Sequence, residues 1–319
     1  MSDSTLPSMG PIVIAGPTAS GKSEISLALA QQLGGPARVE IISADAMQLY
    51  RGMDIGTAKL PVAQRRGITH HQIDVLAVTE EASVAAYQRY ARRDVQAIVE
   101  SHKIPLVVGG SGLYISALVD ELEFPGHDPA VRAELEDVWR QHGLAPLVAE
   151  LEQVDPQAFA VIDLANPRRV IRAVEVNRIT GHSVVPEFPR HTSHYPHAKF
   201  FKLERADLET AIVERAEKMF ADGLLAETQA LQAHGLVANS TAGKAIGYAQ
   251  AAAVLAGEIS VETAIEQTAL ATRRLARRQR TWLRPDPRYV AIAVAENSQA
   301  AVDAAVAQIV AQLPPHWLG

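Results

Sequence analysis

The sequence predicts an α/β fold in which a core with a parallel sheet is interrupted by a helical insertion. Two observations lead to this prediction. Short apolar runs rich in β-branched residues alternate with stretches of helical periodicity, as in folds whose strands are joined through helices. Between about residues 120 and 195 the strand-like runs disappear and helical patterns replace them. We therefore expect a core of residues 10–119 and 196–319 and an insertion of residues 120–195.

Four apolar runs are expected to form strands, and longer periodic segments are expected to form helices. The strands are predicted at residues 11–15, 39–43, 104–108 and 200–203. The helices are predicted at residues 25–33, 83–102, 129–142, 144–153, 167–178, 207–231 and 263–283.

The turn after the first predicted strand carries a phosphate-binding motif. It reads Gly16-Pro17-Thr18-Ala19-Ser20-Gly21-Lys22-Ser23, which matches the P-loop pattern G-x-x-x-x-G-K-[ST]. In a P-loop the backbone N–H groups and the helix N-terminus face an anion, the lysine adds positive charge, and the last hydroxyl can bind Mg²⁺. We therefore expect a P-loop NTPase-like core with a di- or triphosphate on this loop and Mg²⁺ at Ser23.

The composition excludes several classes of protein. The chain has 319 residues, of which 48% are hydrophobic and 21% are charged, as in an ordinary globular protein. It has no run of 18 apolar residues and no cysteine, which argues against a membrane span, disulfides and thiolate zinc sites. No basic residue precedes Lys22, so we expect a cytoplasmic location rather than secretion. The net charge of −6 argues against a uniformly basic nucleic-acid binder but allows a local basic patch.

Asp45 directly follows the second predicted strand. Because ligands of open α/β sheets gather at the carboxyl ends of strands, we expect Asp45 near the P-loop, although such a residue can also cap a helix or turn. The polar, glycine-punctuated stretch at residues 47–59 is expected to be a long functional loop. No metal-ligand spacing surrounds His70 and His71, so we expect substrate contact or packing there.

Two groups of arginines are candidates for binding nucleic acid. Four arginines at residues 168–178 share one predicted helix, where a solvated charged face is an equally good explanation. The second group has six arginines in twelve residues at 273–284, with no acid among them. Guanidinium groups match phosphates and Trp282 offers a stacking surface, so an RNA or DNA contact is favoured in this second group.

Together these segments resemble the bacterial tRNA dimethylallyltransferase family, also called tRNA isopentenyltransferases or IPP transferases. Many enzymes share the P-loop, whereas the segments at residues 45–59 and 277–284 are specific to this family. Further matching segments are His70-His71, Val107 to Tyr114, Arg172-Ala173-Val174-Glu175-Val176 and Ala245-Ile246-Gly247-Tyr248.

The resemblance implies the reaction. The dimethylallyl group of dimethylallyl diphosphate would move to N6 of the adenosine just 3′ of the anticodon in tRNA, with release of diphosphate. Asp45 would act as the general base, Thr18 would hydrogen-bond the bridging oxygen, and Gln48 would pair with the flipped adenine. The insertion would bind the anticodon stem-loop of tRNA, and we expect the protein to be a monomer. The residues implied to contact tRNA are Asp45, Ala46, Met47, Gln48, Ser111, Arg132, Asn166, Arg168, Arg169, Lys244, Gly247, Tyr248, Arg277, Arg278, Gln279, Arg280, Trp282 and Arg284.

Three positions depart from the family's usual pattern. Ala46 stands where the family usually has Ser, and no Asp stands beside Asn166. Ser111 stands where Thr is usual and keeps the hydroxyl.

Two other classes of protein remain open on the sequence alone. A nucleoside-phosphate kinase or another NTPase would share the P-loop, place Asp45 beside a nucleotide, and have no need of the arginine-rich helix. A nucleic-acid-binding module would use the P-loop only to gate binding. A related transferase would use free AMP as acceptor, but the arginines and the insertion favour a large RNA acceptor.

Overall fold

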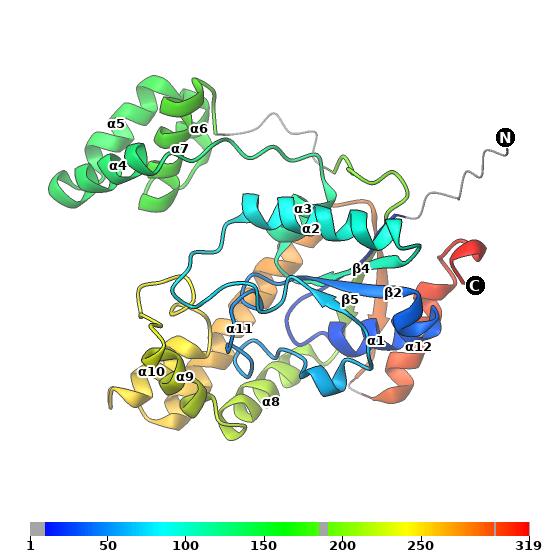
Figure 1. The fold of residues 1–319 in the computed structure, drawn as a ribbon. Coiled ribbons are helices and arrows are strands. Elements are labelled where there is room, and N and C mark those ends of the chain that lie inside the picture. Colours follow the sequence, from blue (N-terminus) through cyan, green and yellow to red (C-terminus); the bar gives the residue numbers. More distant parts are fainter. Residues whose placement is uncertain (1–9, 185–190, 297, 319) are drawn as a thin grey trace, which may run out of the picture. The chain divides into compact units, whose positions relative to one another are not determined.

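The computed structural model describes residues 10–184, 191–296 and 298–318. Over these residues the chain forms two compact units, one before residue 121 and after residue 190, and the other between them. The first unit contains the P-loop and all the strands of the sheet, and the second unit is helical (Figure 1).

The sheet of the first unit confirms the predicted α/β class with parallel strands. Its six strands lie in the order β3-β2-β4-β1-β5-β6, and every neighbouring pair runs parallel. β1 and β4 occupy the centre, so the P-loop leaves the sheet from a central strand. The strands are β1 (Ile12–Ala15), β2 (Val39–Ala44), β3 (His70–His71), β4 (Ile104–Gly109), β5 (Lys199–Arg205) and β6 (Tyr289–Val294).

Eight α-helices and three short 3₁₀ helices complete the described part of the first unit. The α-helices are α1 (Lys22–Gln32), α2 (Val84–Glu100), α3 (Gly112–Val119), α8 (Leu208–Ala221), α9 (Leu224–Ala233), α10 (Tyr248–Leu255), α11 (Val261–Leu283) and α12 (Gln299–Val310). The 3₁₀ helices are η1 (Gly35–Ala37), η2 (Val62–Gln64) and η3 (Pro315–Trp317).

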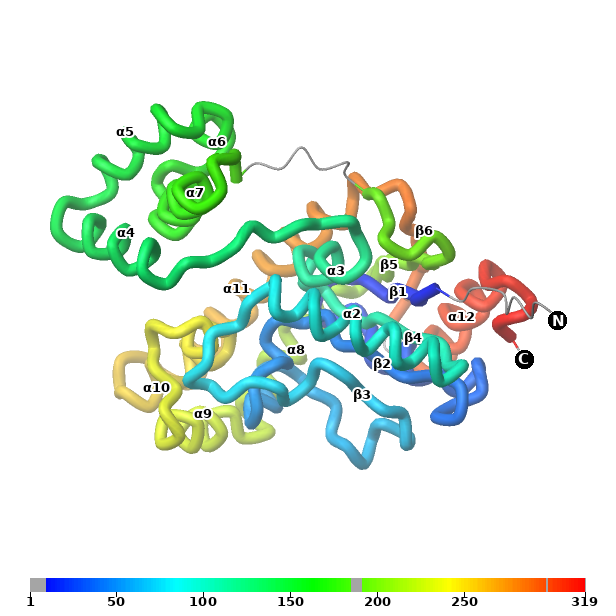
Figure 2. The backbone as a smooth tube through the Cα atoms, turned by 45° about the horizontal axis from the view of Figure 1, so that its top comes forward, coloured from blue at the N-terminus to red at the C-terminus, as the bar shows by residue number. Residues whose placement is uncertain are grey.

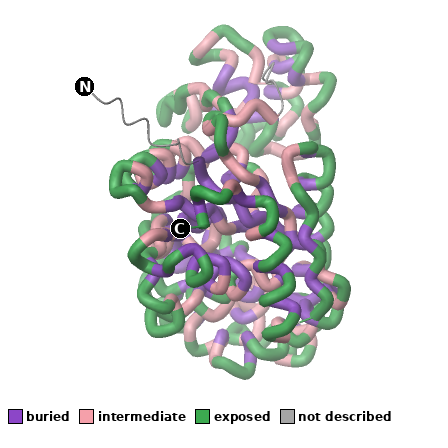
Figure 3. The backbone as a smooth tube through the Cα atoms, turned by 90° about the vertical axis from the view of Figure 1, so that its right-hand side faces the viewer, coloured by how far each residue is buried: buried purple, intermediate pink, exposed green. Residues whose placement is uncertain are grey.

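Helices cover both faces of the sheet, and the side chains of β1 point alternately to one face and the other. Ile12 and Ile14 face the cluster formed with α1 and α12, while Val13 and Ala15 face the cluster formed with α2 and α3. Figure 2 shows the helices on either side of the strands, and Figure 3 shows the buried residues running through the interior. Each fully buried aliphatic side chain contributes roughly 1.5–3 kcal/mol, so these two layers fix the strand ends that carry the site.

The loop after β2 is anchored by a separate apolar cluster with α9 and α10. Tyr50 and Met53 are fully buried and pack in one cluster with Leu224 and Tyr248. The long loop predicted at residues 47–59 is therefore ordered by its own side chains and rests on helices that lie far along the chain.

The second unit has a hydrophobic core of its own. It consists of α4 (Pro129–His142), α5 (Ala145–Val154), α6 (Pro156–Val161) and α7 (Pro167–Thr180), with no strand in the part of it that is described. Its buried core residues are Leu135, Leu147, Leu151, Ala158, Val170, Ile171, Ala173 and Val174. Asp128, Asp155 and Asn166 begin α4, α6 and α7, and each side chain accepts a hydrogen bond from a backbone N–H of the first turn.

The sequence prediction differs from the structure at several elements. Among the elements that were not predicted are the strands β3 and β6 and the helices α6, α10 and α12, and the helix predicted at residues 207–231 is two helices, α8 and α9. Gly223 separates them because its φ of +106° lies in the left-handed region. None of the described helices combines the length and the apolar character needed to span a membrane.

Candidate active site

The P-loop joins β1 to α1 and forms a cradle for an anion. Gly21 precedes α1 with φ +84°, a conformation that favours glycine. A Cβ atom at Gly16 would lie 2.7 Å from the Oγ of Ser20, so this position also requires glycine. The Ser20 hydroxyl is buried and has no hydrogen-bond partner in the described part of the chain, so the cradle holds an unused polar group.

Lys22 supplies the positive charge of the cradle. Its Nζ donates a hydrogen bond to the Pro17 carbonyl at 2.7 Å, so the side chain folds back over the loop. Burial lowers the pKa of Lys22 to about 8, the Asp45 carboxylate opposes this shift, and Arg215 adds to it. An anion bound in the cradle would therefore offset a real electrostatic cost at Lys22.

Asp45 and Arg215 bring a carboxylate and a second cation to the same place. Asp45 is the residue after β2, and its Oδ1 accepts a hydrogen bond from the backbone N–H of Met47 at 3.0 Å. Burial lowers the pKa of the Arg215 guanidinium, and Asp45 acts against this shift. Within the described residues the Arg215 side chain forms no hydrogen bond or ion pair, which leaves its five donors available to a ligand.

The sequence did not single out Arg215. It lies on α8, about 170 positions after Asp45, and a lone arginine on an amphipathic helix gives no local signal. Its place beside the buried stripe of Ile212, Ala216 and Met219 is the one feature that could have pointed to it.

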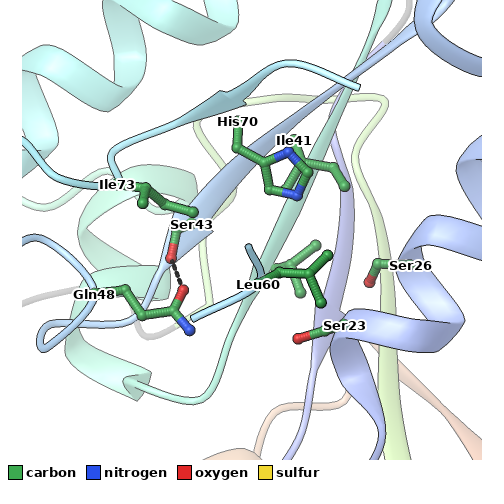
Figure 4. A pocket seen from close by; sticks show the side chains of 9 residues that line it. Ser23, Ser26, Ile41, Ser43, Gln48, Leu60, His70 and Ile73 are labelled. Atoms are coloured by element: carbon green, nitrogen blue, oxygen red, sulfur yellow. Dashed lines mark hydrogen bonds between the residues drawn. The ribbon is translucent and has the colours of Figure 1, made fainter. Parts of the chain in front are cut away.

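A small cavity of about 30 Å³ lies beside the P-loop helix (Figure 4). Its polar lining includes Gln48, whose Oε1 accepts a hydrogen bond from Ser43 Oγ at 3.0 Å and whose Nε2 donates to the Thr57 carbonyl at 3.3 Å. The Ser26 Oγ is buried and, among the described residues, has no partner. The full lining is Ser23, Ser26, Ile41, Ser43, Gln48, Leu60, His70, Ile73 and Val108.

The two adjacent histidines have different surroundings. The His70 ring lines the cavity, and its Nδ1 lies 2.9 Å from the Ile68 carbonyl. Because a carbonyl can only accept a hydrogen bond, Nδ1 carries the ring proton. Burial lowers the pKa of His70, which keeps the ring neutral. His71 instead places Nε2 2.7 Å from a carboxylate oxygen of Glu40. Across the described residues no group of three or more His, Asp or Glu side chains could hold a metal ion.

Residues of α11 connect the P-loop to the glycine turn after β4. The Oε1 of Gln279 accepts a hydrogen bond from the backbone N–H of Thr18 at 2.8 Å. A Cβ atom at Gly110 would lie 2.5 Å from Gln279 Nε2, and one at Gly112 would lie 2.1 Å from the Trp282 ring. Gln279 is buried and supports the P-loop through this bond, and its predicted contact with tRNA stays a prediction.

The Ser111 hydroxyl accepts a hydrogen bond from the backbone N–H of Ala46 at 3.2 Å. It therefore links the glycine turn to the segment that follows Asp45. Ala46 and Ser111, two of the positions that differ from the family's usual residues, are therefore joined by one hydrogen bond.

The C-terminal end of α11, where Gln279 and Trp282 lie, also presents an exposed positive stripe. The side chains of Arg277, Arg278, Arg280 and Arg284 are exposed and form no ion pair with any described residue, and Trp282 is 49% exposed beside them. Arg273 is the exception near the start of the stripe, because its Nε lies 2.8 Å from Glu209. The stripe is therefore available to a polyanion.

The predicted residues of the insertion divide into exposed and engaged side chains. Arg168 and Arg169 are exposed at the start of α7, whereas Asn166 caps that helix. Arg132 pairs with Glu136 at 2.7 Å and with the buried Glu175 at 3.4 Å, so its guanidinium is already largely used within the unit.

Tyr248 lies in the interior of the first unit. It is 1% exposed, and its hydroxyl donates to Glu227 at 2.6 Å, so its side chain does not reach the surface. Gly247, with φ +92°, begins α10 and is also buried, whereas Lys244 is exposed. Both residues have a structural role at the start of α10, and their predicted contacts with tRNA stay predictions.

The fold and the site define a P-loop α/β protein in which an anion cradle lies near a carboxylate. The sequence profile of the IPP transferase family matches residues 48–286. The chain is 49% identical over 278 residues to the tRNA dimethylallyltransferase of Salinispora arenicola, covering 87% of this chain and 80% of that one. It is 50% identical over 280 residues to that of Nocardia farcinica, covering 87% of this chain and 88% of that one.

Solved structures agree with the sequence comparisons. The full-length tRNA isopentenylpyrophosphate transferase of Bacillus halodurans is 33% identical, with a TM-score of 0.67 over 95% of this chain and 96% of that one. A eukaryotic dimethylallyltransferase acting on tRNA is 25% identical, with a TM-score of 0.80 over 95% of this chain and 78% of that one. The protein belongs to the IPP transferase family of tRNA dimethylallyltransferases.

Proposed function

We propose that the protein transfers the dimethylallyl group of dimethylallyl diphosphate to N6 of the adenosine immediately 3′ of the anticodon in tRNA. The observation that carries this proposal is that the P-loop follows β1 and Asp45 follows β2 of the same parallel sheet, so that the Asp45 carboxylate lies close enough to Lys22 and Arg215 to act on their charges. A base and an anion cradle in one place suit a reaction in which an amine displaces diphosphate from carbon.

The P-loop and the two cations would hold the leaving group. Lys22 and Arg215 would neutralise charge on the diphosphate as the bond from C1 to oxygen breaks. The Thr18 backbone N–H is taken by Gln279, but its hydroxyl has no partner in the described residues and is free to donate to the bridging oxygen.

Ser23 suits a magnesium ion that is shared with the substrate. Its side chain is exposed at the start of α1, and its hydroxyl forms no hydrogen bond with the described residues. Mg²⁺ in such sites takes one or two protein oxygens together with substrate phosphates and water, which fits a site with one hydroxyl and no carboxylate cage. When bound, the ion would add positive charge at the departing diphosphate.

Asp45 would accept the proton of the attacking amine. N6 attacks C1, the bond from C1 to the diphosphate oxygen breaks, and one proton of N6 passes to the Asp45 carboxylate. An adenine that stays stacked inside the anticodon loop cannot reach this carboxylate, so the adenine must leave the stack. Gln48 has one N–H and one lone pair left after its bonds to Thr57 and Ser43, enough for a bidentate contact with an adenine edge.

The rest of the tRNA would be held by exposed side chains of both units. The free arginines of α11 and Trp282 suit phosphates and a stacked base, and Lys244 adds charge. Arg168 and Arg169 suit the anticodon stem on the insertion, while Ala46, Met47 and Ser111 border the adenine site. We further propose that the protein works as a monomer in the cytoplasm.

One incubation tests the proposal. Labelled dimethylallyl diphosphate is mixed with the protein and with either total tRNA or AMP, and label is expected only in the tRNA. Label in AMP would identify a free-nucleotide transferase. Thermal protection by low ATP but not by dimethylallyl diphosphate would identify a nucleotide enzyme and refute the proposal.

A further inference from the structure

Hydrogen bonds within residues 53–59 hold together the loop that follows Gln48. The Thr57 hydroxyl donates to the Met53 carbonyl at 2.6 Å, and the Lys59 N–H donates to the Asp54 carbonyl at 2.9 Å. The Ala58 N–H donates to the Ile55 carbonyl at 3.0 Å. These bonds tie residues 53–59 together, so a group that holds residues 55 and 56 also helps to set the direction of the Thr57 carbonyl.

One carboxylate from α9 holds this piece. The Oε2 of Glu227 accepts a hydrogen bond from the Ile55 N–H at 2.9 Å, and its Oε1 accepts from the Gly56 N–H at 3.4 Å and from the Tyr248 hydroxyl at 2.6 Å. Burial together with Glu227 raises the pKa of Tyr248, so this hydroxyl remains a donor. A Cβ atom at Gly56 would lie 2.3 Å from the Tyr248 ring, so the loop packs tightly against α10 at this point.

The Thr57 carbonyl decides which way the Gln48 amide faces. The Ser43 hydroxyl can donate or accept, so it fits either end of the amide. The Thr57 carbonyl can only accept, so the NH₂ end must face it, and Oε1 is then left to Ser43. With this carbonyl displaced, the amide could flip and exchange its free donor and acceptor.

We propose that Glu227 is a positioning residue that sets the amide direction of Gln48 and thereby the preference of the site for adenine. The inference rests on the proposed function, in which Gln48 meets the acceptor base. Adenine offers an amine donor next to a ring acceptor, and guanine offers a carbonyl acceptor next to a ring N–H donor. An amide held in one direction accepts the first edge and mismatches the second.

Glu227→Gln is the direct test because it keeps the size of the side chain. The Ile55 N–H contacts both carboxylate oxygens, Oε2 at 2.9 Å and Oε1 at 3.1 Å, and the Gly56 N–H contacts Oε1, so either orientation of the new amide sets an NH₂ group against a backbone N–H. Glu217→Gln is the matched control, since Glu217 lies exposed on the neighbouring α8 and forms no bond with a described residue.

The readout is the affinity for two anticodon stem-loop RNAs that differ only in adenosine or guanosine at the acceptor position. We expect the wild type and Glu217→Gln to prefer adenosine. Glu227→Gln should lose at least about fivefold of this preference, the lower range for one bidentate base contact. The affinity for dimethylallyl diphosphate should stay within about twofold, because residues 16–23 do not depend on the loop.

A double-mutant cycle with Gln48→Ala separates positioning from general damage. If Glu227 acts through Gln48, adding Glu227→Gln to Gln48→Ala causes no further loss of preference. A full additional loss, or equal weakening of both RNAs and of the diphosphate, would overturn the inference. If Glu227→Gln fails to fold, Tyr248→Phe removes one donor to the same carboxylate and should lower the preference to a smaller extent; an unchanged preference there also overturns it. A wild type without any preference for adenosine would instead count against the proposed function.

Discussion

Replacing Lys22 by Met is expected to make the ligand-free protein more stable while abolishing its response to diphosphate. The pKa of Lys22 falls from 10.5 to about 8 because the charged group is buried. Each pKa unit equals about 1.4 kcal/mol, so the cost of the charge at neutral pH is at most about 3.5 kcal/mol. Solvent contact of the half-buried side chain reduces this to roughly 1–2 kcal/mol. We expect the melting temperature of Lys22→Met at pH 7 to rise by about 2–6 °C.

Lys59→Met provides a control with the opposite sign. The Lys59 side chain is 3% exposed, and its Nζ contacts Asp54 at 2.7 Å, Asp74 at 2.6 Å and the Tyr50 carbonyl at 2.8 Å. Its removal leaves these oxygens without their donor, which should cost about 1–3 kcal/mol and lower the melting temperature. Lys22→Met should thus stabilise the folded protein, because the charge of Lys22 is buried without a full ionic partner. Lys59→Met should destabilise it, because Lys59 donates to three oxygens.

The pH dependence supplies the sharpest check on Lys22. Between pH 8 and 10.5 the unfolded chain retains the Lys22 proton and the folded chain loses it, so the wild type gains stability as the pH rises. The difference between Lys22→Met and the wild type should therefore be largest below pH 8 and shrink above it. Melting curves at pH 7 to 10, with and without dimethylallyl diphosphate, measure both effects. A lower melting temperature for Lys22→Met at pH 7, or an undiminished diphosphate response, would refute this reasoning.

Three further predictions address the base, the arginines and the insertion. Asp45→Asn should slow transfer by about 10²–10⁴-fold while tRNA affinity changes little, as steady-state rates and filter binding on one preparation would show; unchanged turnover removes Asp45 from the role of base. Replacing Arg277 and Arg278 by Gln should reduce the salt dependence of tRNA affinity by about one to two in slope and raise the KM for tRNA alone; an unchanged slope with a lower melting temperature would indicate a structural role. Glu175 is fully buried, and although burial acts to raise its pKa, hydrogen bonds from Arg172 and His127 hold that pKa below its ordinary value. Glu175→Gln should destabilise the insertion by about 2–3 kcal/mol, visible as faster hydrogen exchange in α4 and α7, whereas Glu152→Gln on exposed α5 should not.

The sequence predicted four of the six strands because each is a continuous apolar run beside a turn signal. β3 has two polar residues, His70 and His71, and is a strand only because it pairs with β2. β6 pairs with β5 alone and keeps several exposed positions, so its residues lack the clear signal of a buried strand. Edge strands of this kind are defined by their neighbours rather than by their own residues.

The residues of the candidate site likewise fall into those that local sequence identifies and those that only distant contacts bring into place. The P-loop and Asp45 could be located because a local motif and the carboxyl end of a strand fix them. Arg215 and Glu227 could not, because each meets its partner across about 170 residues of chain and no local pattern encodes that meeting. The burial of Gln279 and Tyr248 could not be predicted either, because packing decides which way a side chain faces.

The charges around the P-loop give a reason why a costly lysine is kept. Lys22, Arg215 and Asp45 together carry a net charge of one, far less than needed to balance an organic diphosphate of about −3 at neutral pH. A magnesium ion at Ser23 would bring the total charge of protein groups, ion and diphosphate close to zero. The charges are therefore balanced only when ion and substrate are both bound. In the absence of substrate the two cations repel each other, and burial lowers the pKa of both. The binding of diphosphate removes that penalty, so stability given up by the free protein becomes affinity for the leaving group and holds it in place as its charge develops.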